Sequence, residues 1–140
     1  MLSLLVVACV SPELAEIGVG PAAMRLPGTT WELEGPNDFG VAVASAGDVD
    51  GDGFADVLVG VPTYNPNPGY QASSTGAAVL FAGSPSGLES LPSWTAVDST
   101  GATRFGDALA GVGDVDGDGY DDVIVGAPYW RNGESDEGAI

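Results

Sequence analysis

An acidic nonapeptide occurs twice in this chain, and the two copies are 66 residues apart (48 to 114). The copies read Asp-Val-Asp-Gly-Asp-Gly-Phe-Ala-Asp from residue 48 and Asp-Val-Asp-Gly-Asp-Gly-Tyr-Asp-Asp from residue 114. Other landmarks keep the same spacing: Phe39-Gly40 returns as Phe105-Gly106, and Gly60-Val61-Pro62 returns as Gly126-Ala127-Pro128. An internal repeat of this length indicates a fold built from like units, each of which buries its apolar face against a neighbour.

The segments between these landmarks have the composition of short β-strands. The runs that leave the acidic loops are β-branched, and Gly, Pro, Asp and Ser clusters separate them from the next apolar run. No window repeats apolar residues at helical spacing over three turns, so we predict an all-β fold. The strands that enter the loops are poor in large side chains, which suits the crowded centre of a radial fold. The expected strands are 29–34, 39–47, 56–60, 76–82 and 93–97, followed by 105–113 and 122–126 in the second unit.

Each nonapeptide carries carboxylates at positions 1, 3, 5 and 9 and a glycine at position 6. Alternate side chains of a tight loop turn inward, and calcium takes six to eight oxygens at about 2.3–2.6 Å in irregular geometry. The backbone carbonyl at position 7 adds one more oxygen. We therefore predict two Ca²⁺ sites, and expect Asp121, at position 8 of the second loop, to face solvent. The predicted ligands are Asp48, Asp50, Asp52, Phe54 and Asp56 in the first loop, and Asp114, Asp116, Asp118, Tyr120 and Asp122 in the second.

Other interpretations of these acidic loops agree less well with the sequence. An EF-hand needs a bidentate glutamate at position 12, where this chain has Val59 and Val125, and it needs flanking helices. Magnesium insists on octahedral geometry and retains its waters. The remaining alternative is an acidic turn without an ion, and two copies in phase favour the metal over it.

The charge of the chain excludes several functions. The formal net charge is −17, with 20 acidic residues against three arginines, and eight of those acids are the predicted metal ligands. A basic footprint is missing, so nucleic-acid binding is excluded. With neither histidine nor lysine, the chain has no Ser-His pair, no histidine-bound zinc and no Schiff base. A two-carboxylate hydrolase stays formally open, but the acids have the better explanation above, and we expect no enzyme activity.

The N-terminal segment carries a different signal. Leu2 to Val10 is apolar but, at nine residues, too short to span a bilayer, which takes about 20. It is typical of the end of a secretory signal, and Val6-Val7-Ala8-Cys9 resembles a bacterial lipobox, whose cysteine is lipidated. We therefore expect residues 1–28 to be a truncated signal or lipobox-like segment with a linker, and Cys9 to be a candidate lipid anchor. The alternative is a free or buried cysteine.

The order Phe-Gly, acidic loop, Gly-x-Pro resembles the FG-GAP repeat of integrin alpha-type β-propellers over about residues 29–140, with Val61 as the departure within the motifs. In that family one repeat makes a four-stranded antiparallel blade, seven blades usually close a ring, and calcium lies between a blade's first two strands. The resemblance implies about two blades of a larger propeller. Residues 29–98 would hold the last strand of a preceding blade and the first repeat. Residues 99–140 would hold a truncated second repeat, and the other blades would come from missing sequence.

The resemblance also implies a function. We expect a non-catalytic, calcium-binding propeller segment of a secreted or cell-surface protein, lipid-anchored to a bacterial membrane if Cys9 is modified, that serves cell adhesion or protein–protein contact. The alternatives are an accessory propeller of an extracellular hydrolase or lyase, with its catalytic domain outside this chain, and a sugar-binding module. The partner would be an extracellular protein or a glycan, and the loop 62–75 is the candidate recognition surface.

Overall fold

The computed structural model describes residues 4–9, 30–35, 38–65, 75–98, 101–131 and 137–140. Within these ranges every regular element is a strand and none is a helix, which confirms the all-β prediction. No helix in the described part of the chain is therefore long and apolar enough to cross a membrane. The strands are β1 (Leu4–Cys9), β2 (Thr30–Gly35), β3 (Ala42–Gly47), β4 (Asp56–Val61), β5 (Ala77–Phe81), β6 (Trp94–Val97), β7 (Ala108–Gly113) and β8 (Asp122–Gly126).

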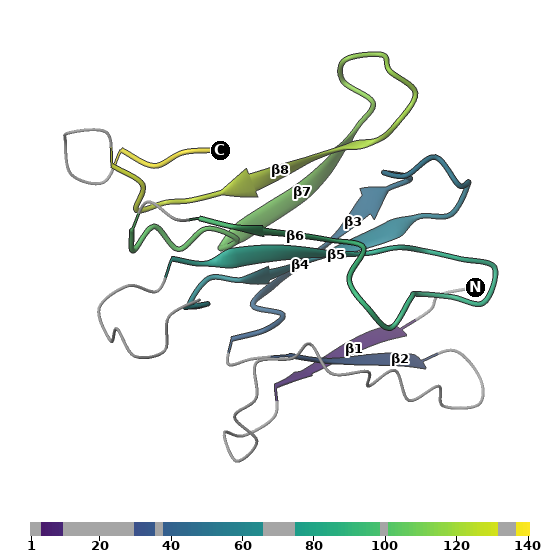
Figure 1. Ribbon diagram of the computed structural model, residues 1–140, viewed down its shortest axis with the longest axis horizontal. Coiled ribbons are helices and arrows are strands. Elements are labelled where there is room, and N and C mark those ends of the chain that lie inside the picture. The colour runs from purple at the N-terminus through teal and green to yellow at the C-terminus, as the bar shows by residue number, and fades with distance from the viewer. Residues whose placement is uncertain (1–3, 10–29, 36–37, 66–74, 99–100, 132–136) are drawn as a thin grey trace.

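Strands β3 to β6 form one antiparallel sheet in chain order, as expected for a complete propeller blade (Figure 1). Strands β7 and β8 form the antiparallel hairpin that begins the second blade, and an isolated bridge between Ala127 and Ala139 marks its expected third strand. The two hairpins have the same register: Ala42 pairs with Gly60, and Ala108 with Gly126. Both carry a β-bulge just before the acidic loop. The sequence repeat is thus a structural repeat.

The central strands of the first sheet are apolar on both faces, as in a sheet covered on both sides. On one face, Val59 and Val79 pack with Phe39 and Phe81, whose rings meet edge to face at 6.2 Å between centroids. The other face forms a second cluster around Leu58, and it is this face that receives the second hairpin. Members of the second cluster are Ala46, Leu58, Ala78 and Leu80, with Phe105, Leu109, Val123 and Val125 packed against them.

The first strands of the two repeats, β3 and β7, lie against each other. Small residues permit this contact: a Cβ added to Gly111 would lie 2.4 Å from the carbonyl oxygen of Ser45. The small side chains of β3 and β7 thus let the two hairpins approach closely. Phe39 is buried in the first core cluster, and its counterpart Phe105 is partly buried against the second. Because β3 and β7 are in contact, the acidic loops that follow them are also neighbours.

The N-terminal segment contributes β1, which pairs in parallel with β2. Strand β2 includes residues 30–34 of the expected strand at 29–34. The rest of the expected leader, residues 1–3 and 10–28, lies outside the described residues, and lipidation of Cys9 stays a prediction. Most of the candidate recognition loop, residues 66–74, also lies outside them, whereas Tyr64 at its start packs against the first core cluster.

Candidate metal centre

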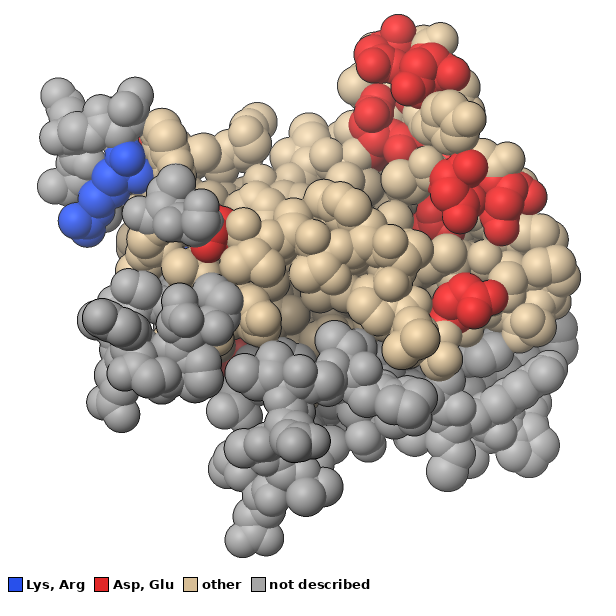
Figure 2. Space-filling model, in the orientation of Figure 1, with Lys and Arg blue, Asp and Glu red and all other residues tan. Residues whose placement is uncertain are grey.

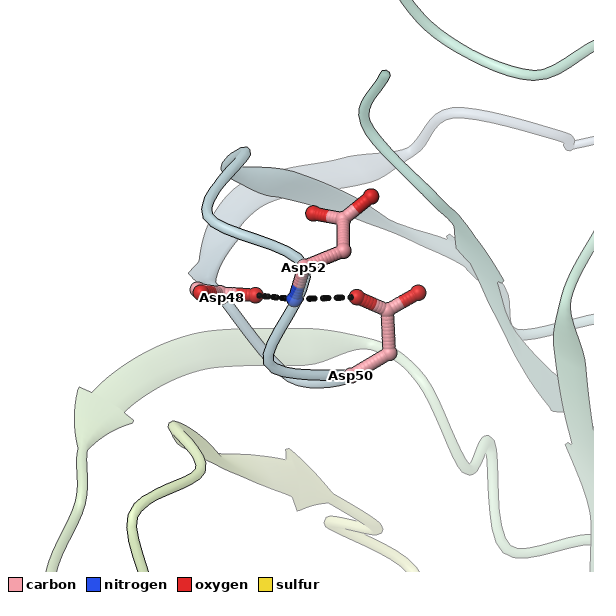
Figure 3. A group of neighbouring side chains, drawn as sticks. All are labelled: Asp48, Asp50 and Asp52. Carbon is pink, nitrogen blue, oxygen red and sulfur yellow. Dashed lines mark hydrogen bonds between the residues drawn. The ribbon is translucent and has the colours of Figure 1, made fainter.

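The first acidic loop connects β3 to β4 and folds around its own carboxylates (Figure 3). Asp48 accepts hydrogen bonds from the backbone N–H groups of Asp52 at 3.0 Å and Gly53 at 2.9 Å. Asp50 accepts a second bond from Asp52 N–H at 3.2 Å, and Asp52 accepts one from Phe54 N–H at 2.8 Å. Aspartates favour such local bonds to the backbone that follows them. Gly53 has a φ of +89°, a conformation that glycine adopts readily because it has no Cβ. This glycine therefore lets the loop turn sharply.

These bonds bring three of the predicted ligands together. One carboxylate oxygen from each of Asp48, Asp50 and Asp52 lies within 4.8 Å of the other two. Asp48 is half-buried, and the other two side chains are exposed. The loop therefore presents a cluster of hard oxygen atoms to solvent at one end of the hairpin.

The second loop, between β7 and β8, repeats this arrangement. Asp114 accepts hydrogen bonds from Asp118 N–H at 3.1 Å and Gly119 N–H at 2.9 Å. Asp116 bonds Asp118 N–H at 3.1 Å, and Asp118 bonds Tyr120 N–H at 2.9 Å. Carboxylate oxygens of Asp114, Asp116 and Asp118 again lie within 4.8 Å of one another. Two loops of one geometry, one repeat apart, are hard to explain as unrelated surface turns.

The aspartates at position 9 stand outside these clusters. Asp56 is 1% exposed, and its carboxylate accepts hydrogen bonds from Val49 N–H at 3.0 Å and Gly83 N–H at 2.7 Å. Asp122 is half-buried and accepts the equivalent bond from Val115 N–H at 2.9 Å. Both side chains thus tie the start of the loop to the strand that leaves it. Their role as metal ligands stays a prediction, as does that of the position 7 carbonyls of Phe54 and Tyr120, whose side chains are exposed.

The donor chemistry of each loop fits a hard divalent cation. The clustered ligand atoms are all carboxylate oxygens, which suit calcium and magnesium better than softer metals. Two unit charges about 4 Å apart repel by roughly 4 kcal/mol at an effective dielectric near 20. Arg104 pairs with Asp107 at 2.6 Å, outside both loops. A divalent cation is the natural counter-charge for these carboxylates, and flexible loop ligands favour calcium over magnesium.

The expectation that Asp121 faces solvent is wrong. Its side chain is half-buried, its carboxylate accepts a hydrogen bond from Asp48 N–H at 2.8 Å, and its own N–H donates to the Asp48 carbonyl at 3.0 Å. The cause is the contact between β3 and β7, which places the start of β8 beside the first loop. The sequence offers one signal that the two loops differ. The nonapeptides are identical except at positions 7 and 8, where the first copy has Phe54-Ala55 and the second has Tyr120-Asp121.

Antiparallel sheets packed on each other, each with an acidic loop between its first two strands, are the arrangement expected of β-propeller repeats. The sequence model of the FG-GAP repeat family matches residues 39–81 and 105–140, more than half of the chain. The chain therefore belongs to the FG-GAP repeat family.

Integrin alpha chains are among its relatives. Integrin alpha-5 of Xenopus laevis is 41% identical over 93 residues, which is 64% of this chain and 8% of that protein. Integrin alpha-IIb of Mus musculus is 37% identical over 128 residues, 82% of this chain and 12% of that protein. Integrin alpha-IIb of Homo sapiens is 40% identical over 105 residues, 73% of this chain and 10% of that protein. The chain thus spans only a small part of the length of these relatives.

Proposed function

We propose that this chain is a calcium-stabilised β-propeller segment of a secreted or cell-surface protein and that it serves adhesion or protein–protein contact. The observation that carries the calcium part is the pair of acidic hairpin loops with equal geometry in neighbouring blades. The similarity to integrin alpha chains supports the extracellular adhesive part.

The role we assign to the metal is structural. The clustered aspartates lie at the turn of a two-stranded hairpin, so an ion bound there would hold the loop closed and tie β3 to β4 or β7 to β8. In the first loop the ligands would be Asp48, Asp50 and Asp52, supported by the Phe54 carbonyl and Asp56. The second loop would use Asp114, Asp116 and Asp118, supported by the Tyr120 carbonyl and Asp122. Neutralising the carboxylates would remove their mutual repulsion.

Calcium is expected to raise the melting temperature of the chain. Extracellular calcium modules bind with dissociation constants of about 10⁻⁴ to 10⁻³ M. At 1 mM calcium, mass action then stabilises the folded state by about 0.4–1.4 kcal/mol per loop. Both loops together should raise the melting temperature by about 5 °C over that in excess chelator. Scanning calorimetry in calcium, in chelator and in magnesium at equal ionic strength would measure the effect.

Substitutions in each loop test whether the calcium-dependent rise in melting temperature comes from the aspartate clusters. Asp50→Ala and Asp116→Ala stand at the same position of the two loops, and each should remove about half of the calcium-dependent shift. The double variant should melt alike in calcium and in chelator. Coincident melting curves of the unmodified chain in calcium and in chelator would refute the metal sites.

The adhesive part is tested by binding to immobilised extracellular proteins. We expect the chain to bind at least one such protein in calcium and to release it in chelator. An array of immobilised glycans in the same buffers is the comparison. Calcium-dependent binding to glycans alone would replace the protein-contact proposal with a sugar-binding one.

A further inference from the structure

The two acidic loops touch each other across the boundary between the repeats. Asp121 in the second loop exchanges two backbone-anchored hydrogen bonds with Asp48 in the first: Asp48 N–H to the Asp121 carboxylate at 2.8 Å, and Asp121 N–H to the Asp48 carbonyl at 3.0 Å. The ring of Tyr120 also lies over Gly51, where an added Cβ would be 2.7 Å from a ring carbon. Figure 2 shows most of the acidic side chains visible in this view in neighbouring groups on one side of the molecule.

Each partner in this contact also belongs to its own loop. The Asp48 carboxylate holds the turn of the first loop through Asp52 and Gly53, so the orientation of the Asp48 backbone sets the orientation of the carboxylate cluster. In the second loop, Asp121 lies between the predicted ligands Tyr120 and Asp122. Ordering of the second loop therefore orders the residue that holds Asp48.

We propose that Asp121 is a positioning residue that couples the two metal loops, so that calcium in the second loop raises the affinity of the first. The inference rests on the proposed calcium sites and adds to them a coupling and the residue that carries it. An ion in the second loop fixes Asp121, and Asp121 fixes Asp48. The first loop then loses less conformational freedom when its own ion binds, which is positive cooperativity without a change of fold.

Electrostatics opposes this coupling, because an ion bound in one loop reduces the negative charge that attracts a cation to the other. The clustered carboxylates other than Asp48 are exposed, so water and salt weaken this electrostatic effect. The hydrogen bonds to Asp48 are local and are not screened in that way. The coupling should therefore be positive at physiological salt, and we expect about a fivefold effect, the low end of measured couplings.

The chain supplies its own matched substitution. Position 8 of the first loop is Ala55, so alanine is already compatible with this loop geometry one repeat away. Asp121→Ala removes the acceptor for Asp48 N–H, whereas Asp121→Asn keeps an acceptor oxygen and removes only the charge. The second loop is disabled by Asp116→Ala together with Asp118→Ala.

The test follows calcium binding at each loop separately by NMR. The amide signal of Gly53 reports the first loop, and that of Gly119 reports the second. Disabling the second loop should raise the calcium concentration for half-saturation at Gly53 about fivefold. Asp121→Ala alone should raise it by a similar factor, and disabling the second loop in that variant should add nothing. Because binding coupling is reciprocal, disabling the first loop should raise half-saturation at Gly119 only while Asp121 is present. Asp121→Asn should keep most of the coupling. The same spectra show whether each variant is folded.

The coupling is overturned if half-saturation at Gly53 does not depend on the second loop, or if it depends on that loop equally with and without Asp121. It is also overturned if Asp121→Asn behaves like Asp121→Ala, because charge rather than the hydrogen bond would then carry the effect. Independent saturation of Gly53 and Gly119 would remove the coupling and leave the calcium sites standing. No response at either glycine would remove both.

Discussion

Gly60→Ala is expected to lower the free energy of unfolding by about 3 kcal/mol, the upper end of overpacking effects. A Cβ on Gly60 would lie 2.0 Å from the carbonyl oxygen of Gly106 and 3.1 Å from its carbonyl carbon. The obstacle is backbone of the next repeat and has no side-chain rotamer through which to move away. Gly106 itself approaches the first sheet closely and has φ of +91°, so it has little freedom to retreat. The second hairpin must shift away from the first sheet to make room.

Gly126→Ala is the matched control, because Gly126 is the counterpart of Gly60 in the second repeat. Its added Cβ would meet no atom closer than the Ala108 Cβ at 3.3 Å, and we expect a loss below about 1 kcal/mol. Urea unfolding of both variants in calcium would give the difference, with the denaturant slope expected to stay constant. Equal losses for the two glycines would contradict the contact between repeats.

This contact gives a physical reason for the two parts of the repeat motif. Within each repeat, the glycine after phenylalanine donates its N–H to the carbonyl of the Gly-x-Pro glycine, at 3.1 Å from Gly40 to Gly60 and 3.0 Å from Gly106 to Gly126. Between repeats, Gly106 also lies against Gly60. The motif glycines therefore form a hydrogen bond within each blade, and they allow the backbones of neighbouring blades to lie close together.

The sequence predicts what the two repeats share. Short apolar runs between turn residues predict strands β3 to β8, because apolar runs and Gly/Pro punctuation are local signals. The spacing of aspartates predicts the carboxylate clusters for the same reason. The strands and the carboxylate clusters both depend on residues within about ten positions of each other, and each pattern occurs twice in the chain.

The sequence does not predict what differs between the repeats. From the sequence, Asp121 is predicted to face solvent. Nothing near it in the chain indicates that it lies beside Asp48, which is 73 residues away. The bond from Gly83 to Asp56 joins residues 27 apart and is equally invisible to local patterns. Such contacts depend on how one sheet packs on another, which the spacing of the repeat does not contain.

Asp56→Ala is expected to lower the free energy of unfolding by about 3 kcal/mol in excess chelator, where no metal contributes. Asp56 is 1% exposed and accepts from two backbone donors, Val49 N–H and Gly83 N–H. Removing the carboxylate leaves both donors without this partner, and an unsatisfied buried donor costs about 1–3 kcal/mol. The substitution also releases the turn that follows β5, which Asp56 holds against the start of β4.

Asp122→Ala is the matched control, since Asp122 holds the same position in the second loop. Its bond to Val115 N–H is exposed to water, which replaces the lost acceptor, so we expect a loss of about 1 kcal/mol. Urea unfolding in chelator compares the two variants, and repeating it in calcium adds the metal contribution. If Asp56 acts only as a metal ligand, the two variants should match each other in chelator. A larger loss for Asp56 in chelator, with a further loss for both in calcium, would show that this aspartate is a structural acceptor first and a ligand second.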